Sequence, residues 1–185
     1  MRSAFIFVDL QEDFFANPLL SGSRTSIAAA VNDLARFSRD RDCPVVWVRQ
    51  EFEADLSDAF LSMRDSGTRI TIRGTDGCKI IHEIGREPTD HEVVKHRYSA
   101  FFDTSMAALL SSLNVSRVVI GGINTHACVR ATAVDAYQRD YRVILAVDTI
   151  SSYDGEYHRE SMRYLAQSIG TSMTNSEIKD LVSAA

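Results

Sequence analysis

The sequence predicts an α/β protein, a three-layer α/β/α sandwich around a mainly parallel sheet. Short runs rich in β-branched residues recur along the chain and are almost continuously apolar, which is typical of strands covered on both faces. Between these runs, apolar residues recur at helical spacing. Strands that alternate with helices through right-handed crossovers build this architecture.

The elements follow in order along the chain. The expected strands cover residues 4–8, 45–48, 93–94, 118–120 and 143–147, with a sixth near 171–173. The helices between them carry one-sided apolar stripes: Ile27, Val31, Leu34 and Ala35, then Met106, Leu109, Leu110 and Leu113, then His158, Met162, Leu165 and Ile169. Thr104 is placed to cap the second helix, and Thr174 with Glu177 has capping-box spacing before a last short helix.

The segment 51–87 is the least regular part of the sequence, with four glycines and many charges. It predicts a long excursion with one or two short helices, which serves as a lid or a subunit contact. The sequence contains no internal repeat, low-complexity tract or linker. We therefore expect residues 1–185 to form a single domain.

Composition narrows the class of protein. The chain has 185 residues, 45% of them hydrophobic, and a chain of this size buries roughly 70% of its unfolded surface without needing disulfides or a metal. The net charge of -5 and the lack of a basic stripe argue against nucleic acid as a partner. No apolar run approaches the ~20 residues that cross a membrane. Three widely spaced cysteines indicate free thiols, and we expect a cytoplasmic protein.

Chemically capable residues follow three of the predicted strands. Asp9 ends the first strand, Lys95 the third, and a Gly-Gly turn after the fourth leads to Cys128. Ala131 and Val134 continue an apolar face from Ala127, which places Cys128 in the first turn of a helix, where the helix dipole favours the thiolate. Because ligands bind at the carboxyl ends of parallel strands, these groups are expected to converge.

Each of the three residues has a plainer interpretation when it is taken alone. Cys128 is compatible with a small buried hydrophobic residue, Asp9 with a turn cap, and Lys95 with a solvated basic cluster. When the three residues are considered together, separate structural roles explain them less well. A carboxylate, an ammonium group and a helix-start thiol on one rim are what a cysteine hydrolase requires: a base, a cation and a nucleophile.

Three motifs carry a resemblance to a known family. Residues 7–14 (FVDLQEDF), 94–104 (VKHRYSAFFDT) and 121–133 (GGINTHACVRATA) resemble the corresponding segments of the isochorismatase-like cysteine hydrolases, in the same order. The resemblance implies a Rossmann-like sheet of six strands and a catalytic triad of Asp9, Lys95 and Cys128. It also implies a cis peptide bond between Ile123 and Asn124, which directs the Asn124 and Cys128 amides into an oxyanion hole.

The resemblance implies a hydrolase for small amides or ureides, which cleaves a C–N bond through a thioester and releases ammonia or an amine. Two alternatives stay open. One is an isochorismatase-type vinyl ether hydrolase, in which Asp9 protonates the substrate and Cys128 is a bystander. The other is a binding protein that keeps the fold without turnover. The resemblance also implies self-association, as a dimer or tetramer.

Metal and nucleotide cofactors are not expected. Nicotinamidases of the resembled family carry an Asp-x-His metal motif after the second strand, where this chain has residues 49–52 (RQEF). The five histidines show no i, i+4 pair, and no Gly-rich nucleotide loop is present. We expect His126, two residues before Cys128, to pack or hydrogen-bond rather than to act as a base.

The substrate pocket is predicted less directly. Phe14, Tyr98 and Phe101 follow the catalytic strands closely enough to line a pocket for a small planar molecule, although core packing suits aromatic residues equally. Gln50, at the end of the second strand, is placed to hydrogen-bond a polar substrate end. Arg49 and Arg97 are open candidates for binding a carboxylate.

Overall fold

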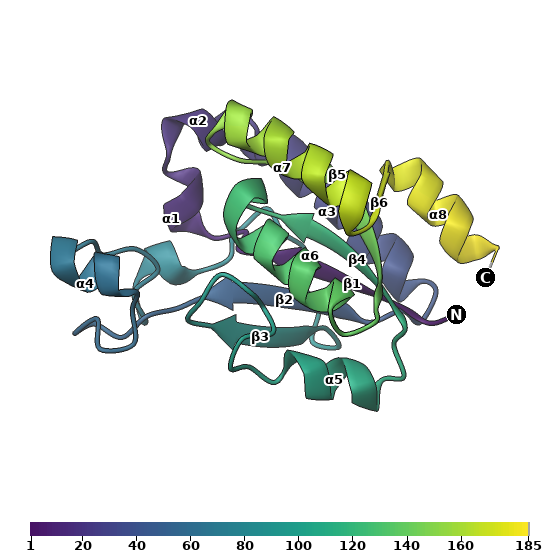
Figure 1. The fold of residues 1–185 in the computed structure, drawn as a ribbon, viewed down its shortest axis with the longest axis horizontal. Helices are drawn as coiled ribbons and strands as arrows, with labels where there is room; N and C mark the ends of the chain where they lie inside the picture. The colour runs from purple at the N-terminus through teal and green to yellow at the C-terminus, as the bar shows by residue number, and fades with distance from the viewer. Residues whose placement is uncertain (185) are drawn as a thin grey trace.

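The computed structural model describes residues 1–184 and contains the expected sheet of six strands, all paired in parallel (Figure 1). The strands are β1 (Ser3–Val8), β2 (Val45–Gln50), β3 (His91–Lys95), β4 (Arg117–Gly122), β5 (Arg142–Ile150) and β6 (Thr171–Met173). Their order across the sheet is β3-β2-β1-β4-β5-β6. The order reverses between β1 and β4, which is where sheets of this type bind ligands.

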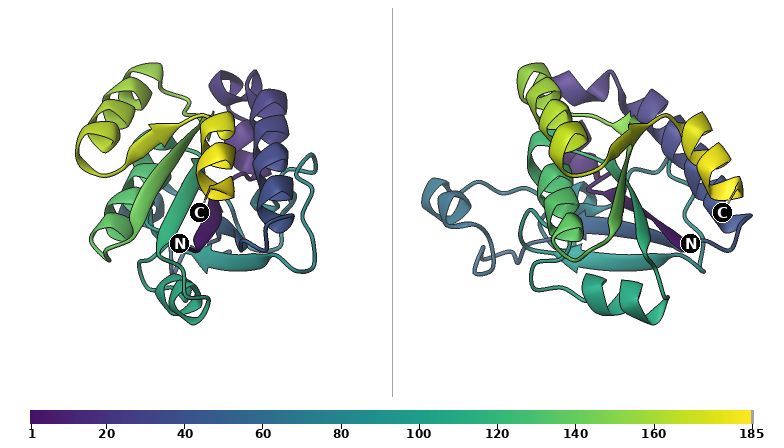
Figure 2. Two further views of the ribbon diagram at one scale, coloured as in Figure 1. Left: turned by 90° about the vertical axis from the view of Figure 1, so that its right-hand side faces the viewer. Right: turned by 45° about the vertical axis from the view of Figure 1, so that its right-hand side comes forward.

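Helices cover both faces of the sheet, as the predicted three layers require (Figure 2). The α-helices are α1 (Glu12–Phe15), α2 (Pro18–Ser21), α3 (Arg24–Arg39), α4 (Leu61–Ser66), α5 (Met106–Ser112), α6 (Arg130–Tyr137), α7 (Gly155–Ser168) and α8 (Asn175–Ser183). Two single turns accompany them, the 3-10 turn η1 (Asp76–Cys78) and the π turn η2 (Thr125–Val129). The predicted capping box of Thr174 and Glu177 begins α8.

Side chains on both faces of the sheet pack in apolar clusters, which explains why successive residues of the strands are apolar. Every residue of β1 is buried, and successive side chains alternate between two clusters. Ile6 and Val8 pack in the cluster that includes residues of α5, α6 and α7, whereas Phe5 and Phe7 pack with α3. The prediction of strands buried on both faces is therefore confirmed.

The irregular segment after β2 forms an arm beside the sheet. Both views show α4 standing away from the sheet (Figures 1 and 2). The arm has a small apolar cluster of its own, built from Phe52, Leu56, Ala59 and Ile72. The expectation of one or two short helices in this segment is confirmed by α4 and η1. Within the described part of the chain, no helix is long and apolar enough to span a membrane.

Gly122 joins the end of β4 to the end of β1. Its φ is +117°, and a Cβ atom added there would lie 2.1 Å from the carbonyl oxygen and 2.5 Å from the amide nitrogen of Val8. Ile123 N donates to the same Val8 carbonyl at 2.9 Å. Only glycine lets the two strands lie this close at the edge where Asp9 and the Cys128 turn begin.

We predict that Gly122→Ala lowers the free energy of unfolding by about 3 kcal/mol or more, because the new methyl group meets backbone atoms and the φ is unfavourable. Urea denaturation monitored by circular dichroism measures the change. The matched control is Gly67→Ala, which has a φ of +68° but open space around it and is expected to cost about 1 kcal/mol. Equal losses in the two variants would contradict the packing argument.

Candidate active site

Asp9 leaves β1 in an unusual backbone conformation. Its φ is +56°, in the left-handed region, which Asp adopts more readily than most residues. Its amide donates to Val48 O at 2.8 Å, and its carbonyl accepts from Gln11 N at 2.8 Å. The chain therefore turns directly after the strand and leaves the carboxylate fully buried at the sheet edge.

Lys95 reaches this carboxylate from a distance. Its strand, β3, is separated from β1 by β2, so the two strand axes lie roughly 10 Å apart. A long side chain is needed to bridge this gap, and Lys95 Nζ lies 2.8 Å from Asp9 Oδ2. The contact is an ion pair in which the ammonium group faces one oxygen of the carboxylate. Nζ also donates to Arg97 O at 3.1 Å.

Cys128 completes the predicted group. Its Sγ lies 3.4 Å from Lys95 Nζ, so the structure brings all three predicted catalytic residues together. As predicted, Cys128 lies in the helical turn that begins this helix; the turn is the π turn η2, which leads into α6. Val129 N donates to Asn124 O, five residues earlier, and this spacing is the one that defines a π turn. The peptide bond between Ile123 and Asn124 is cis, as the resemblance implied.

The electrostatics of the buried trio differ from the sequence expectation of a thiolate. Burial raises the pKa of the Cys128 thiol well above its usual range, the Asp9 charge raises it further, and Lys95 lowers it only in part. Burial also raises the pKa of Asp9, against the lowering effect of Lys95. Burial lowers the pKa of Lys95, but the charges of Asp9 and Cys128 outweigh it and the net direction is upward. The 2.8 Å contact between Lys95 and Asp9 favours an ammonium–carboxylate pair, beside a neutral Cys128 thiol.

A cavity of about 670 Å³ opens onto Cys128. Three of the predicted pocket residues, Phe14, Gln50 and Tyr98, line it together with Asn124. Asp9 and Lys95 do not line the cavity and have no exposed surface. Cys128 is therefore the member of the trio that lines the cavity, and Lys95 contacts both it and Asp9.

Gln50 is positioned by a second glutamine that the sequence did not identify as functional. Gln11 is fully buried, its Oε1 accepts from Gln50 N at 2.8 Å, and its Nε2 donates to Gln50 O at 2.7 Å. The Gln50 side chain is 5% exposed, and its Nε2 has no hydrogen-bond partner in the described chain. An unpartnered buried donor beside a cavity calls for an acceptor on a ligand.

Phe101, the fourth predicted pocket residue, does not line the cavity, and this prediction is wrong. Its ring is 4% exposed and packs in the core against Tyr141, with ring centroids 6.1 Å apart. The reason is a long-range contact: Ala100 N donates to Thr132 Oγ1 on α6 at 3.0 Å, and the next residue follows into the core. The alternative interpretation of core packing holds for this residue.

His126 hydrogen-bonds and packs, as expected, and it also lines the cavity. Its Nδ1 lies 2.7 Å from Ser152 Oγ, and its ring lies 5.1 Å from Tyr153 and 5.5 Å from Tyr157. Burial lowers the pKa of His126, so the ring is neutral at pH 7.

Several lining residues were missed by sequence reasoning. Phe60, Met63 and Ile70 come from the arm, and Tyr153 follows β5. Applying the strand-end rule to β5 would have pointed to Tyr153. No comparable signal exists for the arm, because the direction its side chains face depends on where a long loop lies.

The positions after β2 do not suit the metal motif found in nicotinamidases. Glu51 is the carboxylate there, and both of its oxygens form ion pairs with arginines, one with Arg49 and one with Arg73. These cations hold the pKa of Glu51 down, to about 2, against the effect of burial. The two guanidinium groups already balance the charge of this carboxylate, which makes it a poor ligand for a further cation.

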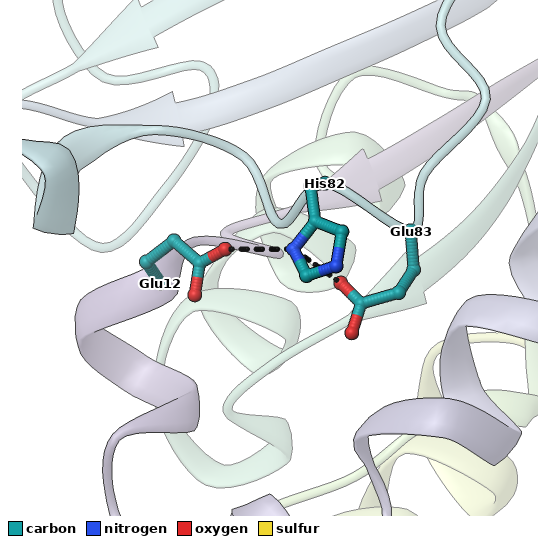
Figure 3. Close-up of side chains that lie close together, drawn as sticks. All are labelled: Glu12, His82 and Glu83. Carbon is teal, nitrogen blue, oxygen red and sulfur yellow. Dashed lines mark ion pairs between the residues drawn. The ribbon is translucent and has the colours of Figure 1, made fainter.

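A second group of possible ligands lies elsewhere, where Glu12, His82 and Glu83 gather around the His82 ring (Figure 3). Arg24 already binds both carboxylates, with Nη1 2.6 Å from Glu12 and Nε 2.7 Å from Glu83. The imidazole side chain is 82% exposed. We interpret this group as a surface ion-pair network centred on Arg24.

The comparisons with known proteins agree with this geometry. Residues 3–177 match the family model described as "Isochorismatase domain". A probable inactive nicotinamidase of Arabidopsis thaliana is 30% identical over 165 residues, which cover 85% of this chain and 84% of that protein.

Two solved structures are similar in fold. A cysteine hydrolase from Pseudomonas syringae pv. phaseolicola 1448A has a TM-score of 0.90 at 24% identity, and the match covers 99% of this chain and 93% of that one. N-carbamoylsarcosine amidase from Thermoplasma acidophilum has a TM-score of 0.81 at 26% identity, over 95% of this chain and 97% of that one.

Because Asp9 and Lys95 carry opposite charges, replacing each of them is expected to shift the pKa of Cys128 in opposite directions. Asp9→Asn removes the negative neighbour and leaves Lys95, so the pKa of Cys128 falls and alkylation by iodoacetamide at pH 7 becomes faster. Lys95→Met removes the positive neighbour, so the pKa rises and alkylation slows. Alkylation rates from pH 6 to 10, with peptide mapping of the labelled cysteine, measure both shifts. Shifts of the same sign in both variants would contradict the assignment.

Proposed function

The chain belongs to the isochorismatase family, and from this premise we propose that it is a cysteine amidohydrolase that cleaves the C–N bond of a small amide or ureide. The observation that carries the proposal is the buried contact of Cys128 Sγ with Lys95 Nζ at 3.4 Å, where Nζ is also 2.8 Å from Asp9. Acyl transfer by a cysteine requires a nucleophile, a base and a cation close together, and these three side chains supply them.

In the first step, Asp9 accepts the proton of the Cys128 thiol. Its raised pKa makes the carboxylate a stronger base than an exposed one. As the proton moves, the negative charge passes from oxygen to sulfur, and Lys95 faces both atoms. The ammonium group thus balances the charge before and after transfer.

The sulfur then forms a bond with the substrate carbonyl carbon, and the carbonyl oxygen becomes an oxyanion. We assign the oxyanion hole to the amides of Asn124 and Cys128. Asn124 is buried, lines the cavity, and its N–H donates to no acceptor in the described chain, which leaves it free for a ligand oxygen.

Collapse of this intermediate breaks the C–N bond. Asp9 returns its proton to the departing nitrogen, and ammonia or an amine leaves while the acyl group stays on Cys128 as a thioester. Asp9 then removes a proton from water, the hydroxide attacks the thioester carbon, and the C–S bond breaks. The acid is released and the thiol regains its proton. Phe14 and Tyr98 hold the substrate body, and Gln50 Nε2 donates to a polar atom of the substrate.

We predict that Cys128→Ala lowers kcat by about four orders of magnitude or more on any amide that the protein hydrolyses, since no other lining group replaces the nucleophile. Ammonia release across a panel of small amides and ureides measures the loss. Cys43→Ala is the control, because Cys43 lies outside the cavity, and it is expected to keep the wild-type rate. Turnover that survives Cys128→Ala, including pyruvate release from isochorismate, would favour the ether hydrolase instead.

A further inference from the structure

The lining of the Cys128 cavity contains no positively charged side chain among the described residues. His126 is its one basic residue, and burial lowers the pKa of this imidazole so that it is neutral at pH 7. The one carboxylate, Asp13, faces the neighbouring loop: its Oδ2 accepts from Thr71 N at 2.6 Å, and its Oδ1 lies against Gly77. A negative charge on a bound molecule would meet no cation there.

The two arginines that the sequence offered for a carboxylate are both engaged elsewhere. Arg97 donates to the carbonyl oxygens of Asp58, at 2.7 Å, and of His96, at 2.6 Å. Its guanidinium lies 5.2 Å from the centre of the Phe60 ring, so it braces the wall of the cavity from outside.

Arg49 is committed on the other side of β2. Its guanidinium pairs with Glu51 and, at 2.9 Å, with Glu92. The neighbouring Gln50 is the residue of this strand that lines the cavity, as expected when successive side chains of a strand point to opposite faces.

Much of the remaining lining is aromatic and apolar, beside uncharged polar side chains that include Asn17, Thr68 and the unpartnered Gln50. Phe14 comes from α1, while Phe60 and Tyr98 lie with ring centroids 4.8 Å apart. Flat apolar walls favour a flat apolar body, and a lone buried N–H donor favours an acceptor atom on it.

We infer that this site takes an uncharged amide with a flat body and that it rejects amides that carry a carboxylate. The inference rests on the proposed amidohydrolase function and names its substrate class. Its physical basis is the desolvation of a charge: a carboxylate that enters the cavity loses water and meets no cation that balances its charge.

The test compares two probes of one ring size, benzamide and 4-carbamoylbenzoate. Each is titrated as a protectant of Cys128 against iodoacetamide at pH 8, with the labelled peptide identified by mass. We expect benzamide to protect at a concentration at least about tenfold lower than the carboxylate. Equal protection, stronger protection by the carboxylate, or protection by neither overturns the inference.

Added charge on α4 supplies a matched control. Ser62 lines the cavity and Leu61 does not, and both are exposed, so neither Ser62→Lys nor Leu61→Lys disturbs the core. We expect Ser62→Lys to improve protection by 4-carbamoylbenzoate about threefold or more relative to benzamide, and Leu61→Lys to leave the ratio unchanged. The same ratio in both variants would show that the lack of a cation does not set the preference.

Ammonia release from the same two probes separates this inference from the proposed function. Selective protection by benzamide without release of ammonia from any amide would leave the inference standing and overturn the amidohydrolase. Release of ammonia from both probes at equal kcat/KM would support the amidohydrolase and overturn the inference that the site rejects carboxylates. Release from benzamide alone is the result that both expect.

Discussion

The ion pair between Lys95 and Asp9 is the interaction on which the rest of the site depends. Both side chains are fully buried, and removing one partner from such a pair typically costs about 3–5 kcal/mol because an uncompensated charge remains. The pair also sets the protonation state of Cys128. One ammonium group balances one negative charge, and in the resting site that charge is on the Asp9 carboxylate, so the thiol keeps its proton. The nucleophile is therefore formed only when a proton moves to Asp9.

The sheet and the arm supply different parts of this site. The strand ends hold the reacting groups at fixed distances, because strand order and register leave them little freedom. The arm supplies the wall that meets the substrate. Arg97 connects the two, since its carbonyl accepts from Lys95 Nζ at 3.1 Å while its guanidinium lies against Phe60. The same residue that helps to orient the cation thus sets the shape of the cavity.

Much of this arrangement was predictable from sequence, for a physical reason. Parallel strands that are buried on both faces have continuously apolar sequences, so their ends can be located in the sequence. Residues at the carboxyl ends of such strands lie at the ligand-binding edge of the sheet, and this rule identified Asp9 and Lys95. The π turn at Cys128 was not identified, because its apolar spacing is nearly that of an α-helix. Phe101 was misplaced because a contact with Thr132, distant in sequence, directs the chain into the core. The wall residues of the arm depend on loop placement, which leaves no periodic pattern.

A neutron crystal structure of the protein in heavy water tests the central claim most directly, because it locates the deuterons of the buried trio. The account predicts three deuterons on Lys95 Nζ, one on Cys128 Sγ and none on Asp9 at pH 7. A deuteron on the Asp9 carboxyl beside a bare sulfur atom would contradict it, since the negative charge would then rest on the nucleophile before any substrate binds.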